Sequence, residues 1–208
     1  MSGIEYFYAA HSAFAYLGSR RLMEIAKASG RTIRHKPYDL RLGMEGVGAR
    51  PTRERTAGHR AYFFGREIQR WSEERSAPVI GHRPTHHDND IGLPNCLLIA
   101  AQEQGADVDG LAHVILEAHW RHDADHADRA TLARLVTSVG GDPSVLLAAA
   151  DSAPIRRIYE DNTAEAIRRS VFGSPTYFVD GDMFYGQDRL EMVERALRQP
   201  YAGTWQAP

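Results

Sequence analysis

Apolar positions near the start of the chain predict two strands with a helix between them. Residues 4–8 are rich in strand-favouring side chains, and residues 32–38 are predicted to form the second strand. The apolar positions of the intervening helix fall on roughly one side: Phe14, Leu17, Leu22 and Ile25. Ser12 is placed to cap this helix and Gly30 to end it. Because crossover connections are usually right-handed, the strands are predicted to be parallel and to form a βαβ unit.

Strand signals nearly vanish over residues 51–169, where apolar residues recur at helical spacing. A helix over 93–104 is predicted to end at Gly105. Three aspartates are placed to cap further helices: Asp109, Asp128 and Asp142. Residues 77–90 carry prolines and turn signals, so they are predicted to form an ordered loop that crosses the surface over a site.

The C-terminal part is predicted to be a β-hairpin followed by a helix. Strand-favouring residues at 176–179 and 183–185 flank Asp180-Gly181, which is a strong signal for a tight turn. Residues 186–188 are then predicted to open the last helix.

A proline at the mouth of this hairpin is the most informative single residue. Pro175 has no N–H to give to a ladder, so it must lie where the ladder ends. The Ser174-Pro175 bond is a candidate cis peptide, because only X–Pro bonds adopt cis at modest cost. A trans proline that ends a loop is the alternative.

A βαβ unit, a helical block and a ββα unit together predict an α/β fold of the thioredoxin-like type with a large all-helical insertion. Residues 1–50 and 170–208 are predicted to form the thioredoxin-like domain, and residues 51–169 the insertion domain. In this fold the turn after the first strand carries the reactive group and faces a cis-proline loop. Thiol oxidoreductases of this type have Cys-x-x-Cys there, whereas this chain has Ser12-Ala13-Phe14-Ala15. Disulfide exchange needs an attacking thiolate, so it is excluded.

Composition narrows the classes of function further. The 208 residues carry a formal net charge of −2, which argues against a nucleic-acid partner. Since no stretch approaches about 20 apolar residues, no membrane span is predicted. The chain enters a strand almost at once without an export signal, so a cytoplasmic location is expected. Cys96 is the single cysteine, which excludes an internal disulfide.

Several short motifs occur together in a recognisable order. They are the strand at 4–8 with Ser12 and Tyr16-Leu17, then Pro94-Asn95, Ala118-His119-Trp120, Val171 to Thr176, and Phe184 to Leu190. In this order and at these separations, the chain from residue 4 to about residue 197 resembles the 2-hydroxychromene-2-carboxylate isomerase family, which is related to kappa-class glutathione transferases.

The resemblance implies that glutathione is the cofactor and that its thiol does the covalent work. Ser12, at a helix N-terminus, is expected to donate to the sulfur and favour the thiolate; the alternative is a plain helix cap. The backbone N–H and C=O of Ser174, beside Pro175, are expected to pair with the cysteinyl unit. The γ-glutamyl end is expected to lie on four residues: Tyr185, Gly186, Gln187 and Asp188. For Asp188 the alternative is a purely structural role as a helix N-cap.

The resemblance also implies the reaction, an isomerisation of 2-hydroxychromene-2-carboxylate or a similar unsaturated aryl pyruvate by reversible thiolate addition. The expected substrate-binding residues are Tyr62, Arg66, Arg70 and Asn95. A solvated helix face is the alternative for the two arginines. The resemblance is weaker in the substrate half of the site, where the sequence departs from the family twice. Phe14 ends a Ser-Ala-Phe turn where the family often has Ser-Pro-Tyr. No lysine stands near Glu45, where isomerases place one.

Histidines and the cysteine offer two further constellations. A metal could be held by His119, His122 and His126 with Asp123 and Asp125 among them. Further ligands are offered by His86, His87 and Asp88. A clear fourth ligand at fixed spacing is missing, so a polar turn between helices is favoured and no metal is predicted. Cys96 is predicted to be a buried small hydrophobe.

Three hypotheses remain open from the sequence. The first is the glutathione-dependent isomerase, acting on a small aromatic substrate. The second is a kappa-like glutathione transferase that acts on another electrophile. The third is a redox-dead thioredoxin-like protein that binds a peptide along the edge at Pro175. The sequence leaves a homodimer open.

Overall fold

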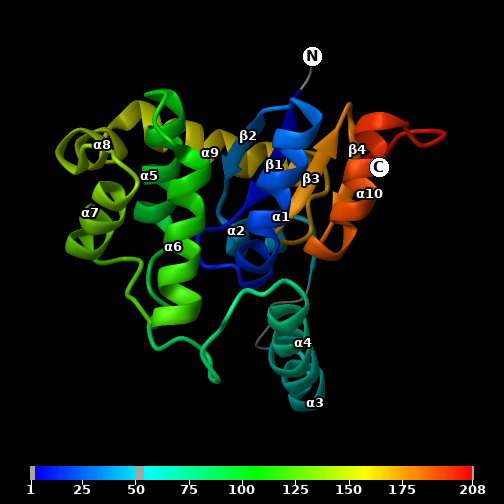
Figure 1. The fold of residues 1–208 in the computed structure, drawn as a ribbon, viewed down its shortest axis with the longest axis horizontal. Coiled ribbons are helices and arrows are strands. Elements are labelled where there is room, and N and C mark those ends of the chain that lie inside the picture. Colours follow the sequence, from blue (N-terminus) through cyan, green and yellow to red (C-terminus); the bar gives the residue numbers. More distant parts are fainter. Residues whose placement is uncertain (1–2, 50–53, 208) are drawn as a thin grey trace.

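A four-stranded mixed sheet forms the centre of the protein (Figure 1). The structure is a computed structural model that describes residues 3–49 and 54–207. Its strands are β1 (Ile4–Tyr8), β2 (Ile33–Pro37), β3 (Thr176–Val179) and β4 (Asp182–Tyr185), in the order β2-β1-β3-β4. β1 is parallel to β2 and antiparallel to β3, with Tyr6 opposite Tyr177. The predicted βαβ and ββα units are therefore confirmed.

Alternating side chains on the strands give the sheet two different faces. Ile4, Tyr6 and Tyr8 of β1 belong to the main core, which α1 (Ala13–Ser29) and α10 (Leu190–Arg198) share. Phe7 and Phe178 belong to a second, smaller core with Ala166 of α9 (Ala153–Arg168) and Leu40 of α2 (Leu40–Gly46). Both faces of the sheet are thus covered by helices (Figure 1).

The caps predicted for the first helix are confirmed. Ser12 is the N-cap of α1, and Gly30 ends the helix in the left-handed conformation with φ of 62°. The tight turn of the C-terminal hairpin is also confirmed, since Asp180 and Gly181 both have positive φ, 50° and 92°. The start of the last helix differs from the prediction. Residues 187–189 form a 3₁₀ turn, and α10 begins only at Leu190.

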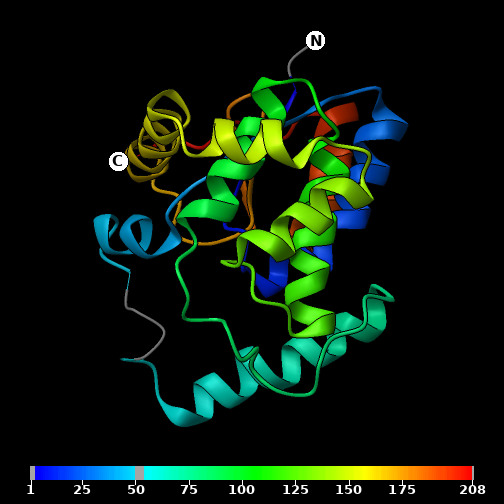
Figure 2. The same cartoon turned by 90° about the vertical axis from the view of Figure 1, so that its left-hand side faces the viewer.

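The helices between β2 and β3 make up most of the remaining chain. They are α2, α3 (Ala57–Ala61), the π-helical turn η2 (Tyr62–Arg66), α4 (Glu67–Glu74), α5 (Gly92–Glu103), α6 (Val108–His122), α7 (Arg129–Ser138), α8 (Pro143–Ala150) and α9. Figures 1 and 2 show α3, η2 and α4 as one rod that lies apart from the α5 to α8 block. No helix in the described ranges is long and apolar enough to cross a bilayer.

Two of the three predicted aspartate caps in this block are confirmed, those at Asp128 and Asp142. The cap predicted at Asp109 is wrong, because Asp107 caps α6 and accepts a hydrogen bond from the N–H of Gly110 at 2.9 Å. The Asp109 carboxylate lies in the first turn and instead meets His35 Nε2 of β2 at 2.6 Å. The Asp109 carboxylate thus has a tertiary partner in place of the predicted capping role.

Candidate active site

The turn between β1 and α1 places Ser12 at the N-terminus of a 17-residue helix. Ser12 is 8% exposed, and its side chain accepts a hydrogen bond from the N–H of Ala15 at 3.3 Å. Its hydroxyl donates to the carbonyl oxygen of Ser174 at 3.0 Å. The helix N-terminus carries about half a positive charge. Ser12 thus combines a hydroxyl donor with the positive field of a helix N-terminus, and both stabilise an anion such as a thiolate.

The loop that faces Ser12 contains the Ser174-Pro175 peptide bond, which is cis. Ser174 Oγ accepts a hydrogen bond from the N–H of Ala9 at 3.1 Å, so the loop and the turn are joined by two hydrogen bonds in opposite directions. The Ser174 carbonyl, which is expected to pair with the cysteinyl unit of glutathione, is not free in the structure, because it already accepts from Ser12. A carbonyl oxygen has two lone pairs, so it keeps room for a second donor.

Tyr185 and Gly186 continue the same surface from the end of β4. The N–H of Gly186 donates to the carbonyl of Pro175 at 2.9 Å, which joins β4 to the cis-proline loop. Tyr185 is 39% exposed, lies against Gly173 and meets the Phe172 ring with centroids 4.8 Å apart. Burial of part of the ring raises the pKa of the Tyr185 phenol, so it stays protonated at neutral pH. Ser12, Ser174, Pro175, Tyr185 and Gly186 therefore form one connected site.

A methyl group at Gly173 is expected to disturb this surface. A Cβ at Gly173 would overlap the ring of Tyr185, so Gly173→Ala must displace either the ring or the loop. We expect a loss of about 1–3 kcal/mol in unfolding free energy or in ligand binding, the usual cost of overpacking. Chemical denaturation measures the change in unfolding free energy, and titration with glutathione, the ligand expected from the sequence, measures the change in binding.

Gly81→Ala is the matched control for that change, because a Cβ at Gly81 meets no heavy atom within 4 Å. This control should behave like the wild type in both measurements. A Gly173→Ala protein that is equally unaffected would show that the contact with Tyr185 is not needed.

Gln187 and Asp188 have different surroundings, although they are neighbours in the 3₁₀ turn. Gln187 is 1% exposed, and its Oε1 accepts from Arg75 Nε at 3.0 Å. Arg75 also donates to the Gln187 carbonyl at 3.2 Å and pairs with Glu191 at 2.9 Å. Asp188 is accessible and pairs with Arg189 at 2.6 Å. A ligand ammonium group can reach Asp188 from solvent but must compete there with Arg189, whereas the Gln187 amide faces inward.

The residues predicted for the substrate lie on the rod of α3, η2 and α4. Tyr62, Arg66 and Arg70 are all exposed there. Arg70 pairs with Glu67 at 2.6 Å and lies 5.9 Å from the centroid of the Tyr62 ring. The rod touches the first helix through Phe63, whose ring centroid is 5.0 Å from that of Phe14. An aromatic contact thus joins the rod to the helix that Ser12 begins.

Asn95 is the fourth residue predicted for the substrate, and it lies in the protein interior. Its Oδ1 accepts from the N–H of Ala10 at 3.0 Å. Its Nδ2 donates to the Tyr38 carbonyl at 3.3 Å and to the Tyr159 hydroxyl at 3.4 Å. In this arrangement Asn95 holds the turn that carries Ser12 from behind.

Four histidines lie behind that turn, and we call them the histidine cluster: His11, His119 and His126, which are buried, and His87, which is half-buried. The His11 and His87 ring centroids are 4.9 Å apart, and those of His119 and His126 are 4.3 Å apart. Burial lowers the pKa of all four, to about 3 for His87 and about 4 for His126. The cluster is therefore uncharged at neutral pH.

The cluster does not match the ligand sets considered from the sequence. His122 is exposed and stands outside it, while His11, which no spacing argument selected, belongs to it. Among the residues that the structure describes, no three His, Cys, Asp or Glu side chains are grouped to hold a metal ion. Cys96 is buried as predicted, and burial raises the pKa of its thiol.

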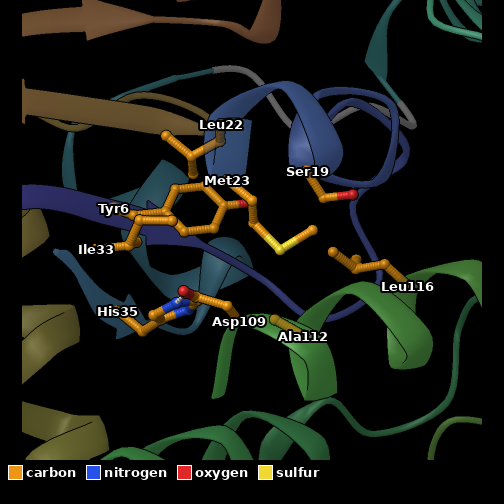
Figure 3. A pocket seen from close by; sticks show the side chains of 9 residues that line it. All are labelled: Tyr6, Ser19, Leu22, Met23, Ile33, His35, Asp109, Ala112 and Leu116. Atoms are coloured by element: carbon orange, nitrogen blue, oxygen red, sulfur yellow. Dashed lines mark hydrogen bonds and ion pairs between the residues drawn. The ribbon is translucent and has the colours of Figure 1, made fainter. Parts of the chain in front are cut away.

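The small cavity shown in Figure 3 lies away from this site. It has a volume of about 10 Å³, room for roughly one water. Tyr6 and Met23 line it from one side and His35 and Asp109 from the other (Figure 3). The cavity lies between α1, β2 and α6, and none of the residues that line it belongs to the site around Ser12.

Fold and site together define a thioredoxin-like protein with serine at the reactive position. The chain belongs to the DSBA-like thioredoxin domain family, whose model matches residues 3–198. It is 29% identical over 195 residues to a 2-hydroxychromene-2-carboxylate isomerase of Pseudomonas sp. (strain C18), covering 93% of this chain and 89% of the relative. It is 27% identical over 197 residues to the enzyme of that name from Pseudomonas putida, covering 93% of both.

A solved structure agrees with these relatives. The structure of a 2-hydroxychromene-2-carboxylate isomerase matches with a TM-score of 0.80 and 26% identity, over 94% of each chain. The relatives support an isomerase as the enzyme class within this family.

Proposed function

We propose that the protein is a glutathione-dependent isomerase of 2-hydroxychromene-2-carboxylate or a similar unsaturated aryl pyruvate. The observation that carries the proposal is the Ser12 hydroxyl, held at the start of α1 against the cis-proline loop. Cys96, the single cysteine, is buried in α5, so the thiol for such a site must come from a ligand. The names of the relatives supply the substrate class.

The residues around Ser12 fit glutathione at two of its three parts. The hydroxyl and the helix N-terminus suit the sulfur. The accessible Asp188 carboxylate suits the γ-glutamyl ammonium group. The second lone pair of the Ser174 carbonyl suits a backbone N–H of the cysteinyl unit. Gln187, which is also expected at the γ-glutamyl end, is not available there, because its side-chain oxygen already accepts from Arg75.

When bound, glutathione supplies a thiolate whose reversible addition turns a conjugated double bond into a single bond that rotates. Ser12 favours the thiolate, since an isolated thiol has a pKa of about 8.5 and is mostly protonated at neutral pH. To do so its hydroxyl must turn from the Ser174 carbonyl to the sulfur. That exchange costs about 1 kcal/mol, and a bond to a charged acceptor returns about 1.5–3 kcal/mol.

The aromatic part of the substrate is placed against the contact between Phe14 and Phe63. Tyr62 and Arg66 follow on the same rod and provide exposed hydrogen-bonding groups for its carboxylate and phenolate. Arg70 is less available, because it pairs with Glu67. Arg66 therefore has the larger part in holding the carboxylate.

The proposed function is tested by measuring both the isomer formed and the glutathione that remains. Wild-type protein, glutathione and 2-hydroxychromene-2-carboxylate should yield the ring-opened isomer while the total of free glutathione stays constant. Glutathione should also raise the free energy of unfolding, by about 2.7 kcal/mol at 100 times its Kd. S-methylglutathione, which has no thiol, should stabilise the protein without supporting turnover.

Two results would contradict the proposal. Stoichiometric loss of glutathione without isomer would show a transferase that acts on an electrophile. A melting temperature that millimolar glutathione leaves unchanged would show that the tripeptide is not a ligand, and would favour a binding protein instead.

A further inference from the structure

The turn that carries Ser12 is held by side chains of the helical insertion as well as by its own domain. The N–H of Ala9 donates to Ser174 Oγ at 3.1 Å, within the sheet domain. The N–H of Ala10 donates to Asn95 of α5 at 3.0 Å. The carbonyl of His11 accepts from the indole N–H of Trp120 of α6 at 2.9 Å. Successive residues of the turn are thus anchored by three different parts of the chain.

The Trp120 contact acts on the peptide bond that leads directly into Ser12. The carbonyl of this peptide accepts from Trp120, and its N–H, which belongs to Ser12, donates to the Ala9 carbonyl at 3.0 Å. Both polar groups of one planar unit are therefore fixed. The plane of that unit sets φ of Ser12, which is −76°, and so the direction of the Ser12 side chain.

The histidine cluster orients the Trp120 ring. Trp120 is 6% exposed, and the rings of His87 and His119 meet its indole edge to face with centroids 5.4 and 5.8 Å away. The Trp120 carbonyl also accepts from the N–H of Ile80 at 2.8 Å, which ties the loop over 77–90 to α6. The Trp120 ring therefore has little freedom to turn its N–H away from His11.

The histidines themselves are held in one arrangement by their hydrogen bonds. His119 Nδ1 lies 3.2 Å from the Ala124 carbonyl, which only accepts, so this nitrogen carries the hydrogen of the neutral ring. His119 Nε2 must then accept, and His87 Nδ1 is its donor at 3.0 Å. His126 Nδ1 lies 3.0 Å from His119 Nδ1 and is the second acceptor for its hydrogen. One backbone carbonyl thereby determines the tautomers of three neighbouring rings.

We propose that Trp120 is a positioning residue for Ser12, acting through the His11 carbonyl and oriented by the histidine cluster. The proposal rests on the proposed function, because it concerns how well the Ser12 hydroxyl meets the glutathione sulfur. Trp120 does not touch the sulfur in this role. It fixes the plane of the peptide before Ser12, and a small rotation of that plane moves the hydroxyl.

Trp120→Phe tests the role, because phenylalanine keeps an aromatic ring and loses the N–H donor. We expect kcat to fall about tenfold with KM for glutathione nearly unchanged, since a small misplacement of a reacting group costs rate more than binding. The ultraviolet thiolate band of bound glutathione, titrated against pH, should shift so that the thiol pKa is higher than in the wild type. A loss of packing alone would not move that titration.

Trp205→Phe is the matched control. Trp205 also donates one indole N–H to a backbone carbonyl, that of Arg169 at 3.3 Å, and it lies near the C-terminus. This control should leave kcat and the thiolate titration unchanged. If Trp120→Phe proves unstable, an isosteric benzothienyl-alanine at position 120, with the other two tryptophans replaced by phenylalanine, removes only the N–H.

The outcomes separate this inference from the proposed function. A wild-type protein that shows a thiolate band, together with a Trp120→Phe protein whose titration and kcat are unchanged, overturns the positioning role alone. A wild-type protein that shows no thiolate band with glutathione overturns both proposals. A raised thiol pKa with a lower kcat, in Trp120→Phe but not in Trp205→Phe, supports the positioning role.

Discussion

Replacing Ser12 by alanine should lower kcat by about 10²–10³-fold, the effect of removing one preorganised donor to a developing anion. Glutathione should still bind, because the Ser174 carbonyl and the Asp188 carboxylate are not altered. The wild type without glutathione provides the floor for this assay. Steady-state kinetics and a separate glutathione titration measure rate and binding independently.

Ser12 also caps α1, so the loss of the cap must be separated from the loss of the hydroxyl. Alanine at an N-cap costs about 1 kcal/mol, whereas glycine costs only a few tenths. Ser12→Gly should therefore be nearly as stable as the wild type and yet as inactive as Ser12→Ala. Equal activity loss with unequal stability would assign the catalytic effect to the hydroxyl.

Ser19→Ala is a control within the same helix. The Ser19 hydroxyl is buried and donates to the Tyr16 carbonyl at 2.8 Å. Ser19 lies about two helical turns beyond Ser12 along α1. This variant should keep the wild-type kcat. An unchanged kcat in both Ser12 variants would rule out a role for Ser12 in activating the thiol.

Acidification should destabilise the protein steeply because of the histidine cluster. The folded pKa is about 3 for His87 and about 4 for His126, lowered by burial and then by their histidine neighbours, while an unfolded histidine has 6.5. Below pH 6.5 the unfolded chain binds protons that the folded chain does not, so the stability present above that pH is lost as the pH falls. Each such histidine contributes up to about 1.4 kcal/mol per pH unit.

Denaturant unfolding at several values from pH 7 to pH 4.5 measures this slope. His126→Asn should flatten it, since the asparagine oxygen can accept from His119 as Nδ1 does and cannot take up a proton in this range. His122→Asn, a change at an exposed position at the C-terminal end of α6, leaves the cluster intact and should keep the wild-type slope. A wild-type stability that does not fall between pH 6.5 and 4.5 would show that the cluster is not buried in its neutral form.

Local patterns in the sequence were sufficient to predict most of the fold. The strand at Ile4–Tyr8, the Ser12 and Gly30 caps and the Asp180-Gly181 turn all agree with the prediction. These features depend on hydrogen bonds and backbone preferences within a few residues. The error at Asp109 shows where such reasoning ends, because His35, distant in the chain, engages the carboxylate that seemed placed to cap.

The sequence alone shows that the turn has no reactive cysteine and that Ser12 begins a helix. Neither feature depends on a tertiary contact, because one is the chemistry of a residue and the other a local capping position. The partners of the site residues cannot be read in this way. Ser12 meets Ser174 across 162 positions, and Gln187 meets Arg75 across 112.

The same holds for the support behind Ser12, where Trp120 reaches the His11 carbonyl across 109 positions. Buried polar groups must find a hydrogen-bond partner, and which partner is within reach depends on how the helices pack. The sequence by itself thus determined the order of the elements and the kind of group at the helix start. Only the tertiary structure decided which polar groups stay open to a ligand and which hold the turn in place.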